Sequence, residues 1–150
     1  MSNIIKKVII YIIVFIENLG ISCASENYKF KQELLSEINY QRELTGLNDL
    51  KLSTDLSDAA EIRAKEAAEL WSHIRPDGTQ YDALINDSDW TISGENLAKS
   101  TEGVSCGIIV NAWMKSELHR LNIINPKFLQ CGIGVYKRNN KIYIALIFTD

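Results

Sequence analysis

This sequence has little net charge, few cysteines and histidines, and no internal repeat. Each of these features excludes some classes of protein. The 150 residues carry 16 Lys and Arg against 19 Asp and Glu, a formal net charge of −3, and no basic stripe stands out. Nucleic acid is therefore not an expected partner, because binding to phosphates needs clustered positive charge. No internal repeat or low-complexity segment is visible. With only 3 Cys and 2 His, the chain lacks the cysteine ligands of a closed structural zinc site.

The remaining composition is that of an ordinary globular domain. Hydrophobic residues make up 46% of the chain and charged residues 23%. A chain of this length is long enough to bury one real core, so we expect a single domain.

The first 24 residues differ in kind from the rest. Two lysines precede an apolar run at residues 8–16, and Ser22 and Ala24 fit the small-x-small pattern of a signal-peptidase site. We expect residues 1–24 to be a signal peptide cleaved after Ala24, and the protein to be secreted or associated with the cell wall. The alternative is an uncleaved anchor, the only membrane contact expected, although the run is short for a bilayer.

The cysteines leave two alternatives open. Cys23 would leave with the signal peptide, while Cys106 and Cys131 would remain in an oxidising compartment. They form either one disulfide or two buried free thiols, since spacing alone does not show whether their Cα atoms approach closely enough.

Hydrophobic periodicity predicts three helices. They are expected over residues 29–44, from a cap at Ser53 or Thr54 to about Trp71, and from near Ser105. Residues 25–29 are expected to be a short leader, and residues 30–150 the domain itself.

Strands are expected mainly at the C-terminal end. Residues 130–136 and 141–149 are rich in β-branched and aromatic residues, and residues 138–140 should join them in a tight hairpin because Asn tolerates a positive φ. A short strand at residues 90–93 should lead into a turn at residues 94–98. Helices mixed with a few antiparallel strands predict an α+β domain.

Three segments hold both histidines and both prolines. Residues 71–79 read Trp-Ser-His-Ile-Arg-Pro-Asp-Gly-Thr, and residues 94–98 read Gly-Glu-Asn-Leu-Ala. Residues 112–136 contain Trp-Met-Lys-Ser-Glu-Leu-His-Arg-Leu-Asn-Ile, then Asn-Pro-Lys-Phe, then Gly-Ile-Gly-Val. In this order and spacing they resemble the motifs of the bacterial CAP domain, also called SCP-like, of the cysteine-rich secretory, antigen 5 and pathogenesis-related proteins. The resemblance implies a three-layer α-β-α sandwich with a small central antiparallel sheet.

His73, Glu95 and His119 are the candidate site residues, one from each segment. Two imidazoles and a carboxylate on three turns are a competent ligand set for a divalent cation such as zinc, and could also do acid/base chemistry. The plainer alternative is that the histidines only hydrogen-bond Glu95 and backbone. The resemblance implies a cleft with two His and two acids, which binds divalent cations in some members. Ser116 stands where the fourth acid would be, on the same helix face as Trp113.

Three functions remain open. The first is an extracellular binding module whose polar cleft takes a metal, a small molecule, a lipid or a cell-wall ligand. The second is an extracellular hydrolase, either a protease or a cell-wall enzyme. The third is a structural or adhesive domain. No catalytic residue is assigned, because neither Ser72 nor Ser116 lies in a nucleophile elbow. Arg75 and Arg120 are expected to pair with nearby carboxylates rather than with an anionic ligand.

Overall fold

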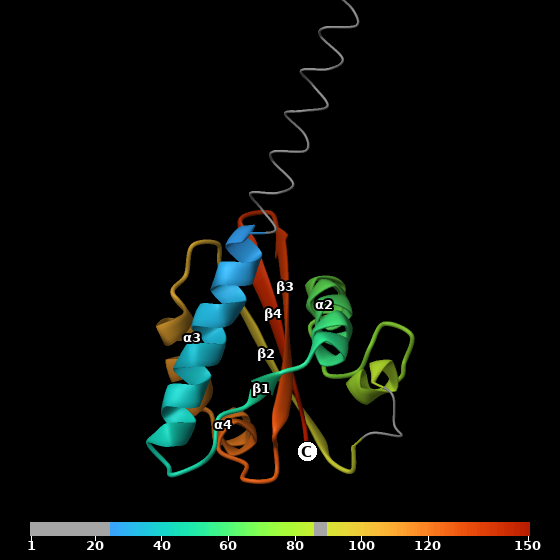
Figure 1. Cartoon of the computed structure of the whole chain (residues 1–150). Coiled ribbons are helices and arrows are strands. Elements are labelled where there is room, and N and C mark those ends of the chain that lie inside the picture. The colour runs from blue at the N-terminus through green and yellow to red at the C-terminus, as the bar shows by residue number, and fades with distance from the viewer. Residues whose placement is uncertain (1–24, 86–89) are drawn as a thin grey trace, which may run out of the picture.

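The part of the chain that the structure describes has an α+β fold, with four helices and one four-stranded mixed sheet (Figure 1). The computed structural model describes residues 25–85 and 90–150, so the expected signal peptide lies outside the described residues. Residues 25–43 are helical. The elements that follow are β1 (Lys51–Leu52), α2 (Thr54–Glu69), the 3-10 helix η1 (Tyr81–Leu84), β2 (Ser93–Thr101), α3 (Cys106–Lys115), α4 (Glu117–Ile123), β3 (Gln130–Arg138) and β4 (Lys141–Thr149). No helix within the described ranges is long and apolar enough to cross a membrane.

The sheet has the strand order β1-β3-β4-β2 and is mixed, not purely antiparallel as expected. β3 and β2 flank β4 in antiparallel pairing, but β1 runs parallel to β3. The N–H groups of Lys51 and Ser53 donate to the carbonyls of Leu129 and Cys131. The connector before α2 therefore pairs with the start of β3 as it passes, over a stretch too short to show a strand pattern in sequence.

Helices cover both faces of this sheet, in an arrangement consistent with the α-β-α sandwich. One face packs against residues 25–43 and α3, and the other against α2 (Figure 1). Alternation along β4 decides the sides: Ile144 and Leu146 belong to the first cluster, Ala145 and Ile147 to the second. The two predicted C-terminal strands are confirmed, and one face of their hairpin lies entirely in the first cluster: Ile133, Val135, Ile142, Ile144, Leu146 and Phe148.

The hairpin turn and the cap of α2 also follow the sequence. Asn139 and Asn140 have φ values of 53° and 58°, as a two-residue turn with both central residues left-handed requires. Ser53 is the N-cap of α2 and accepts from the N–H of Leu56.

Two boundary predictions are wrong. Residues 25–29 are helical instead of forming a leader. Residues 94–98 are not a turn but the first half of β2, whose nine residues pair without interruption with β4. Gly, Glu, Asn and Lys have low strand propensity, and a complete hydrogen-bonded ladder outweighs it here.

The two cysteines are free and buried, so the possible disulfide between Cys106 and Cys131 is not formed. The thiol of Cys106, in the first turn of α3, donates to the carbonyl of Phe30 at 3.5 Å. Cys131 is completely buried in β3. Burial raises the pKa of Cys106 to about 11 and that of Cys131 to about 12, which keeps both thiols protonated.

α2 lies directly on the backbone of β3, at the two glycines of the Gly-Ile-Gly-Val segment. A Cβ added at Gly132 would lie 2.0 Å from the carbonyl carbon of Leu56, and one at Gly134 would lie 1.9 Å from the carbonyl oxygen of Ala60. Real Cβ atoms do not approach backbone so closely. The two glycines therefore set the height of α2 above the sheet.

We expect Gly134→Ala to lower the free energy of unfolding by at least about 2 kcal/mol, because α2 must move away from the sheet to admit the methyl group. Gly107→Ala is the matched control. Its Cβ would meet only Glu37, at 3.8 Å, within α3, so it should be neutral or stabilising by roughly 0.5–1 kcal/mol. Urea unfolding measures both. Equal stabilities for the two variants would contradict the contact between α2 and β3.

Candidate functional site

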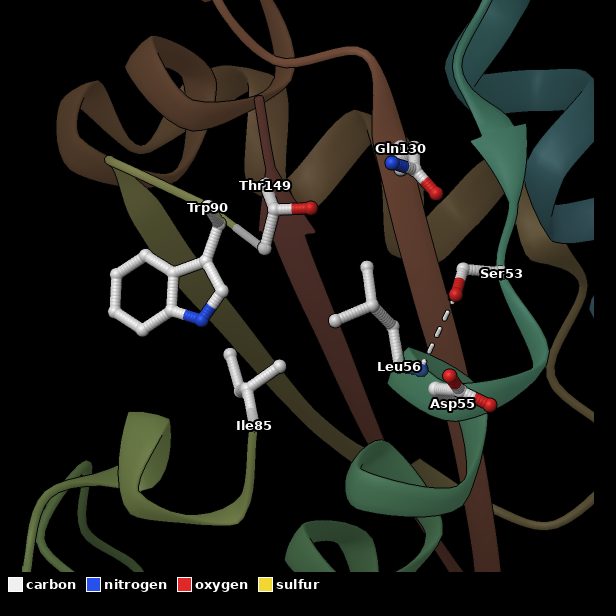
Figure 2. Close-up of a pocket in the computed structure, with 7 residues that line it drawn as sticks. All are labelled: Ser53, Asp55, Leu56, Ile85, Trp90, Gln130 and Thr149. Carbon is white, nitrogen blue, oxygen red and sulfur yellow. Dashed lines mark hydrogen bonds between the residues drawn. The ribbon is translucent and has the colours of Figure 1, made fainter. Parts of the chain in front are cut away.

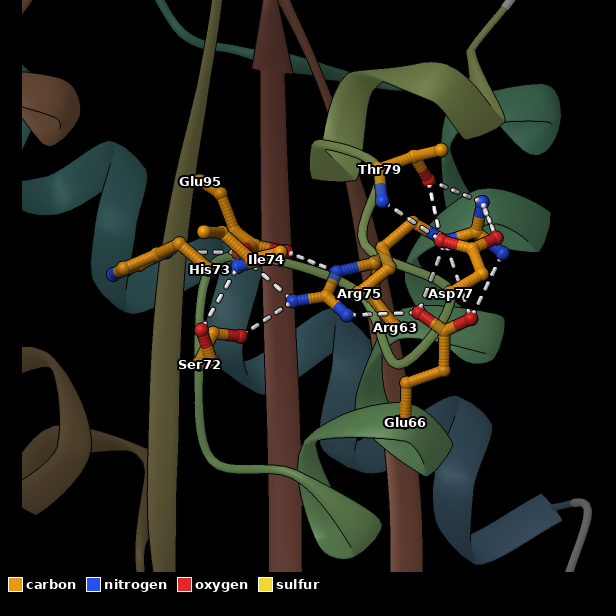
Figure 3. Close-up of polar contacts among 9 residues, drawn as sticks. All are labelled: Arg63, Glu66, Ser72, His73, Ile74, Arg75, Asp77, Thr79 and Glu95. Carbon is orange, nitrogen blue, oxygen red and sulfur yellow. Dashed lines mark hydrogen bonds and ion pairs between the residues drawn. The ribbon is translucent and has the colours of Figure 1, made fainter.

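The site is built around the buried guanidinium of Arg63 on α2. Its Nε donates to Glu95 Oε2 at 2.8 Å, and a terminal nitrogen donates to Glu95 Oε1 at 3.3 Å. The same nitrogen donates to the carbonyl of Ser72 at 2.8 Å, and the other donates to Glu66 at 2.8 Å (Figure 3). Burial alone would lower the pKa of Arg63, but the hydrogen bonds and charges of Glu95 and Glu66 outweigh burial and raise it. Arg63 thus stays charged without contact with water.

Glu95 holds His73 in place. Its side chain is completely buried, and Oε1 lies 2.8 Å from His73 Nδ1, while the His73 side chain is 55% exposed. A carboxylate can only accept, so Nδ1 carries a proton, and in the neutral form of the ring the lone pair is on Nε2. The ring of His73 is therefore fixed by Glu95, with Nε2 directed away from that carboxylate.

The network continues outward from Glu66 with charges of alternating sign. Arg75 donates to Glu66 at 2.9 Å and lies 3.1 Å from Asp77. Burial would raise the pKa of Glu66, but hydrogen bonds from Arg75 and Arg63 outweigh it and lower that pKa. The expectation that Arg75 pairs with carboxylates is confirmed. For Arg120, no ion pair occurs among the described residues.

Two asparagines hold His119 from the other face of β2. Asn96 is completely buried and donates to the carbonyl of His119 at 3.0 Å. Asn122 donates to Asn96 Oδ1 at 2.9 Å and to the carbonyl of Glu95 at 3.3 Å. Because successive side chains of a strand point to opposite faces, Glu95 fixes His73 on one side of β2 and Asn96 fixes α4 on the other. The two histidines are thus positioned from opposite faces of β2, which is an edge strand.

His119 forms a pair of its own with Ser116. Its Nδ1 lies 2.8 Å from Ser116 Oγ, at the junction between α3 and α4. His119 belongs to the first turn of a helix, not to the polar turn that the sequence predicted. Burial, and then the positive charge that nearby His73 carries when it is protonated, lower the pKa of His119. His119 is therefore neutral at physiological pH.

A largely apolar pocket of about 300 Å³ opens beside this pair. Ser116 and His119 lie on its wall together with Trp71 and Trp113, while Trp113 also donates from Nε1 to the carbonyl of Leu97 at 2.9 Å. Trp71 is 51% exposed, which makes it a wall of the cleft and not part of the core. The remaining lining residues are Leu97, Ala98, Lys99, Ser100, Ile108, Ile109 and Ala112.

The proposed three-residue metal ligand set is not assembled. Within residues 25–85 and 90–150, no group of three or more His, Cys, Asp or Glu side chains could hold a metal ion. Both oxygens of Glu95 are engaged by Arg63 and His73, so Glu95 would have to leave a buried ion pair to act as a ligand. Glu95 instead accepts from His73 and orients its ring, which is the role of a carboxylate behind a metal-binding histidine.

Arg63 is the functional residue that sequence reasoning missed. It lies within the alanine stripe of α2, where its neighbours on the buried face are Ala60, Ala64 and Ala67. An arginine inside a stripe of small buried residues needs a buried partner, and that was the available signal. Asn122 was also missed, and nothing in its spacing singles it out.

We expect Arg63→Met to cost about 3–5 kcal/mol of unfolding free energy, because it leaves Glu95 buried without its partner. Arg75→Met is the matched control: Arg63 still pairs with Glu66, so the cost should be about 1 kcal/mol or less. Denaturant unfolding monitored by circular dichroism measures both variants. Equal costs would show that Arg63 is not the centre of the network.

Comparison with known proteins places this geometry in a family. The family model described as "CAP: Cysteine-rich secretory protein family" matches residues 35–149. YkwD of Bacillus subtilis (strain 168) is 29% identical over 121 residues, which cover 78% of this chain and 46% of YkwD. The chain thus spans about half the length of the curated relative it matches.

Solved structures agree with the sequence match. An outer surface protein from Borrelia burgdorferi has a TM-score of 0.71 at 26% identity, covering 81% of this chain and 92% of that chain. A cysteine-rich secretory protein from Staphylococcus aureus has a TM-score of 0.61 at 26% identity, covering 77% and 37%. Since the family model covers well over half of the sequence, this chain belongs to CAP, the cysteine-rich secretory protein family.

Proposed function

We propose that this CAP domain is an extracellular binding module whose cleft takes a small ligand with a polar group and an apolar part. The observation that carries the proposal is the position of the pair formed by His119 and Ser116 on the wall of the apolar pocket of about 300 Å³. Pockets that bind small molecules are mostly apolar, with a few placed polar groups that fix orientation. Export is proposed by analogy, because the relatives carry the descriptions "outer surface" and "secretory".

The hydrogen bonds that Glu95 accepts favour a binding function over a catalytic one. A general base must be free to take a proton, but both oxygens of Glu95 already accept hydrogen bonds from Arg63 and His73. Its role is to fix the ring of His73. The pocket therefore offers the neutral imidazole of His119 and the hydroxyl of Ser116 beside an apolar wall, while Glu95 holds the ring of His73.

The same cleft is a candidate site for a divalent cation held by His73 and His119. Glu95 would orient His73, and the two imidazoles leave positions for water or a ligand group, so affinity should be modest. NaASP2, a structure of the same fold with a TM-score of 0.58, was crystallised with Zn2+. At 14% identity this likeness concerns the fold, so the zinc proposal rests on the two imidazoles of this chain.

Calorimetric titration of the full chain with zinc should show one site at about pH 7.5, and both His73→Ala and His119→Ala should weaken it. Burial, and then His73, lower the pKa of His119, so this ring stays neutral above its usual value of 6.5. Protonated imidazole cannot ligate, so the contribution of His119 to zinc affinity should be lost only as the pH drops below that value. Asp77→Asn is the control, since it changes an outer acid of the same network. If the double histidine variant binds zinc as wild type does, or wild type binds none, the cation site is wrong.

A second candidate function is a hydrolase, favoured by one observation, the 2.8 Å contact between Ser116 Oγ and His119 Nδ1. Such a pair resembles a nucleophile with its base. Among the described residues, however, no carboxylate accepts from the other nitrogen of His119, and an orienting group of that kind completes most serine hydrolase triads.

We expect no turnover of p-nitrophenyl acetate that depends on Ser116. Ser116→Ala and the control Ser100→Ala, a second hydroxyl on the same pocket wall, should leave the slow background rate unchanged. Loss of turnover in Ser116→Ala but not in Ser100→Ala would replace the binding module with the hydrolase.

A further inference from the structure

A second cavity lies on the α2 side of the sheet, where β3 begins and β4 ends. It has a volume of about 190 Å³. Figure 2 shows its apolar walls, Leu56 of α2 and Ile85 after η1, with the indole of Trp90 opposite α2. None of its lining residues lines the pocket beside His119.

Polar groups around this cavity are left without partners among themselves. Nε1 of Trp90 is buried and donates no hydrogen bond, one of two such buried side-chain atoms among the described residues. Thr149 is 4% exposed, and its hydroxyl points into the space between Gln130 and Leu56. Among the seven lining residues, the only hydrogen bond that involves a side chain joins Leu56 N–H to Ser53 Oγ. A buried N–H donor without an acceptor is unfavourable, so the Trp90 N–H indicates a ligand that supplies a hydrogen-bond acceptor.

The side chains that line the cavity favour some classes of ligand over others. The carboxylate of Asp55 repels anions such as phosphate. The indole of Trp90 turns its N–H edge toward Leu56 and Ile85, and this positive edge disfavours a cation. A hydroxyl group can accept a hydrogen bond from Trp90 and donate one to Asp55. The side chains of Thr149 and Gln130 can each donate or accept a hydrogen bond.

We propose that this cavity is a binding site for one neutral sugar ring. A pyranose offers adjacent hydroxyls around an apolar C–H face, matching the unpartnered polar groups and the wall of Leu56 and Ile85. The volume equals that of about six water molecules at roughly 30 Å³ each, enough for one ring and no more. The occupant is either a free monosaccharide or the terminal unit of a glycan.

The three tryptophans give the test its probe, because each contributes one indole N–H signal to an NMR spectrum of the 15N-labelled full chain. Trp71→Phe and Trp90→Phe assign the signals. The chain is titrated with the methyl glycosides of glucose, mannose and N-acetylglucosamine, and with a matching trisaccharide. Sodium phosphate and tetramethylammonium chloride represent the anion and the cation.

At least one glycoside should move the Trp90 indole signal saturably, as its free N–H gains an acceptor. The Trp113 signal should stay fixed, because that N–H already donates to Leu97. Binding of a small ring through few hydrogen bonds should be weak, with Kd on the order of 1 mM. Tighter binding of the trisaccharide would identify a glycan end, and equal binding a free sugar.

Thr149→Val keeps the shape of the side chain and removes its hydroxyl, so it should weaken binding by about 3–10-fold, whereas Thr101→Val at the exposed end of β2 should not. Trp90→Phe, which keeps a ring without the donor, is the second variant if the first does not fold, and its binding is followed through the backbone amide signals because it lacks the indole signal. The proposal is overturned if no glycoside moves the Trp90 signal, which would mean that water alone fills the cavity. It is also overturned if phosphate or tetramethylammonium moves that signal equally, or if both variants bind as wild type does.

Discussion

The buried ion pair between Arg63 and Glu95 is the interaction on which the site depends. A guanidinium and a carboxylate can both leave water only when each satisfies the other and their remaining hydrogen-bonding groups are also used. Arg63 meets this condition through Glu66 and the carbonyl of Ser72, and Glu95 meets it through His73. The pair therefore fixes the chain after α2 to β2. It also decides which nitrogen of His73 faces the cleft.

The ion pair in turn depends on the height of α2 above the sheet. Gly132 and Gly134 let the helix backbone lie directly on β3, and Ala60 and Ala64 fill the contact without pushing the two apart. A side chain as long as arginine can then reach over the sheet to the edge strand. The Gly-Ile-Gly-Val segment lies far from His73 in sequence, yet it acts on the site by setting this distance.

The parts that the sequence predicted are those governed by local rules. The Asn139–Asn140 turn, the cap at Ser53 and the alternation along β4 each follow from a few neighbouring residues, and each is confirmed. The parts that it missed depend on pairing between distant segments. Residues 94–98 look like a turn until β4 supplies a complete ladder, and residues 51–52 are a strand only because β3 begins beside them. The histidines could be singled out by resemblance, whereas the saturation of Glu95 by Arg63 could not, because it depends on how α2 sits on the sheet.

A second buried arginine holds α4, the helix that carries His119, although His119 itself forms no ion pair with any described residue. Arg42, from the helix at residues 25–43, donates to the carbonyls of Ile123 and Asn125 at the end of α4, and to that of Phe128. The last carbonyls of a helix lack intrahelical partners and carry partial negative charge, so a guanidinium satisfies them. Burial lowers the pKa of Arg42, but the pKa of free arginine is so high that the charge remains. α4 is thus fixed by Arg42 at its end and by Asn96 near its start. The two histidines are therefore positioned by different groups: the ion pair of Arg63 and Glu95 orients His73, whereas His119 is positioned through backbone carbonyls that accept from Asn96 and Arg42.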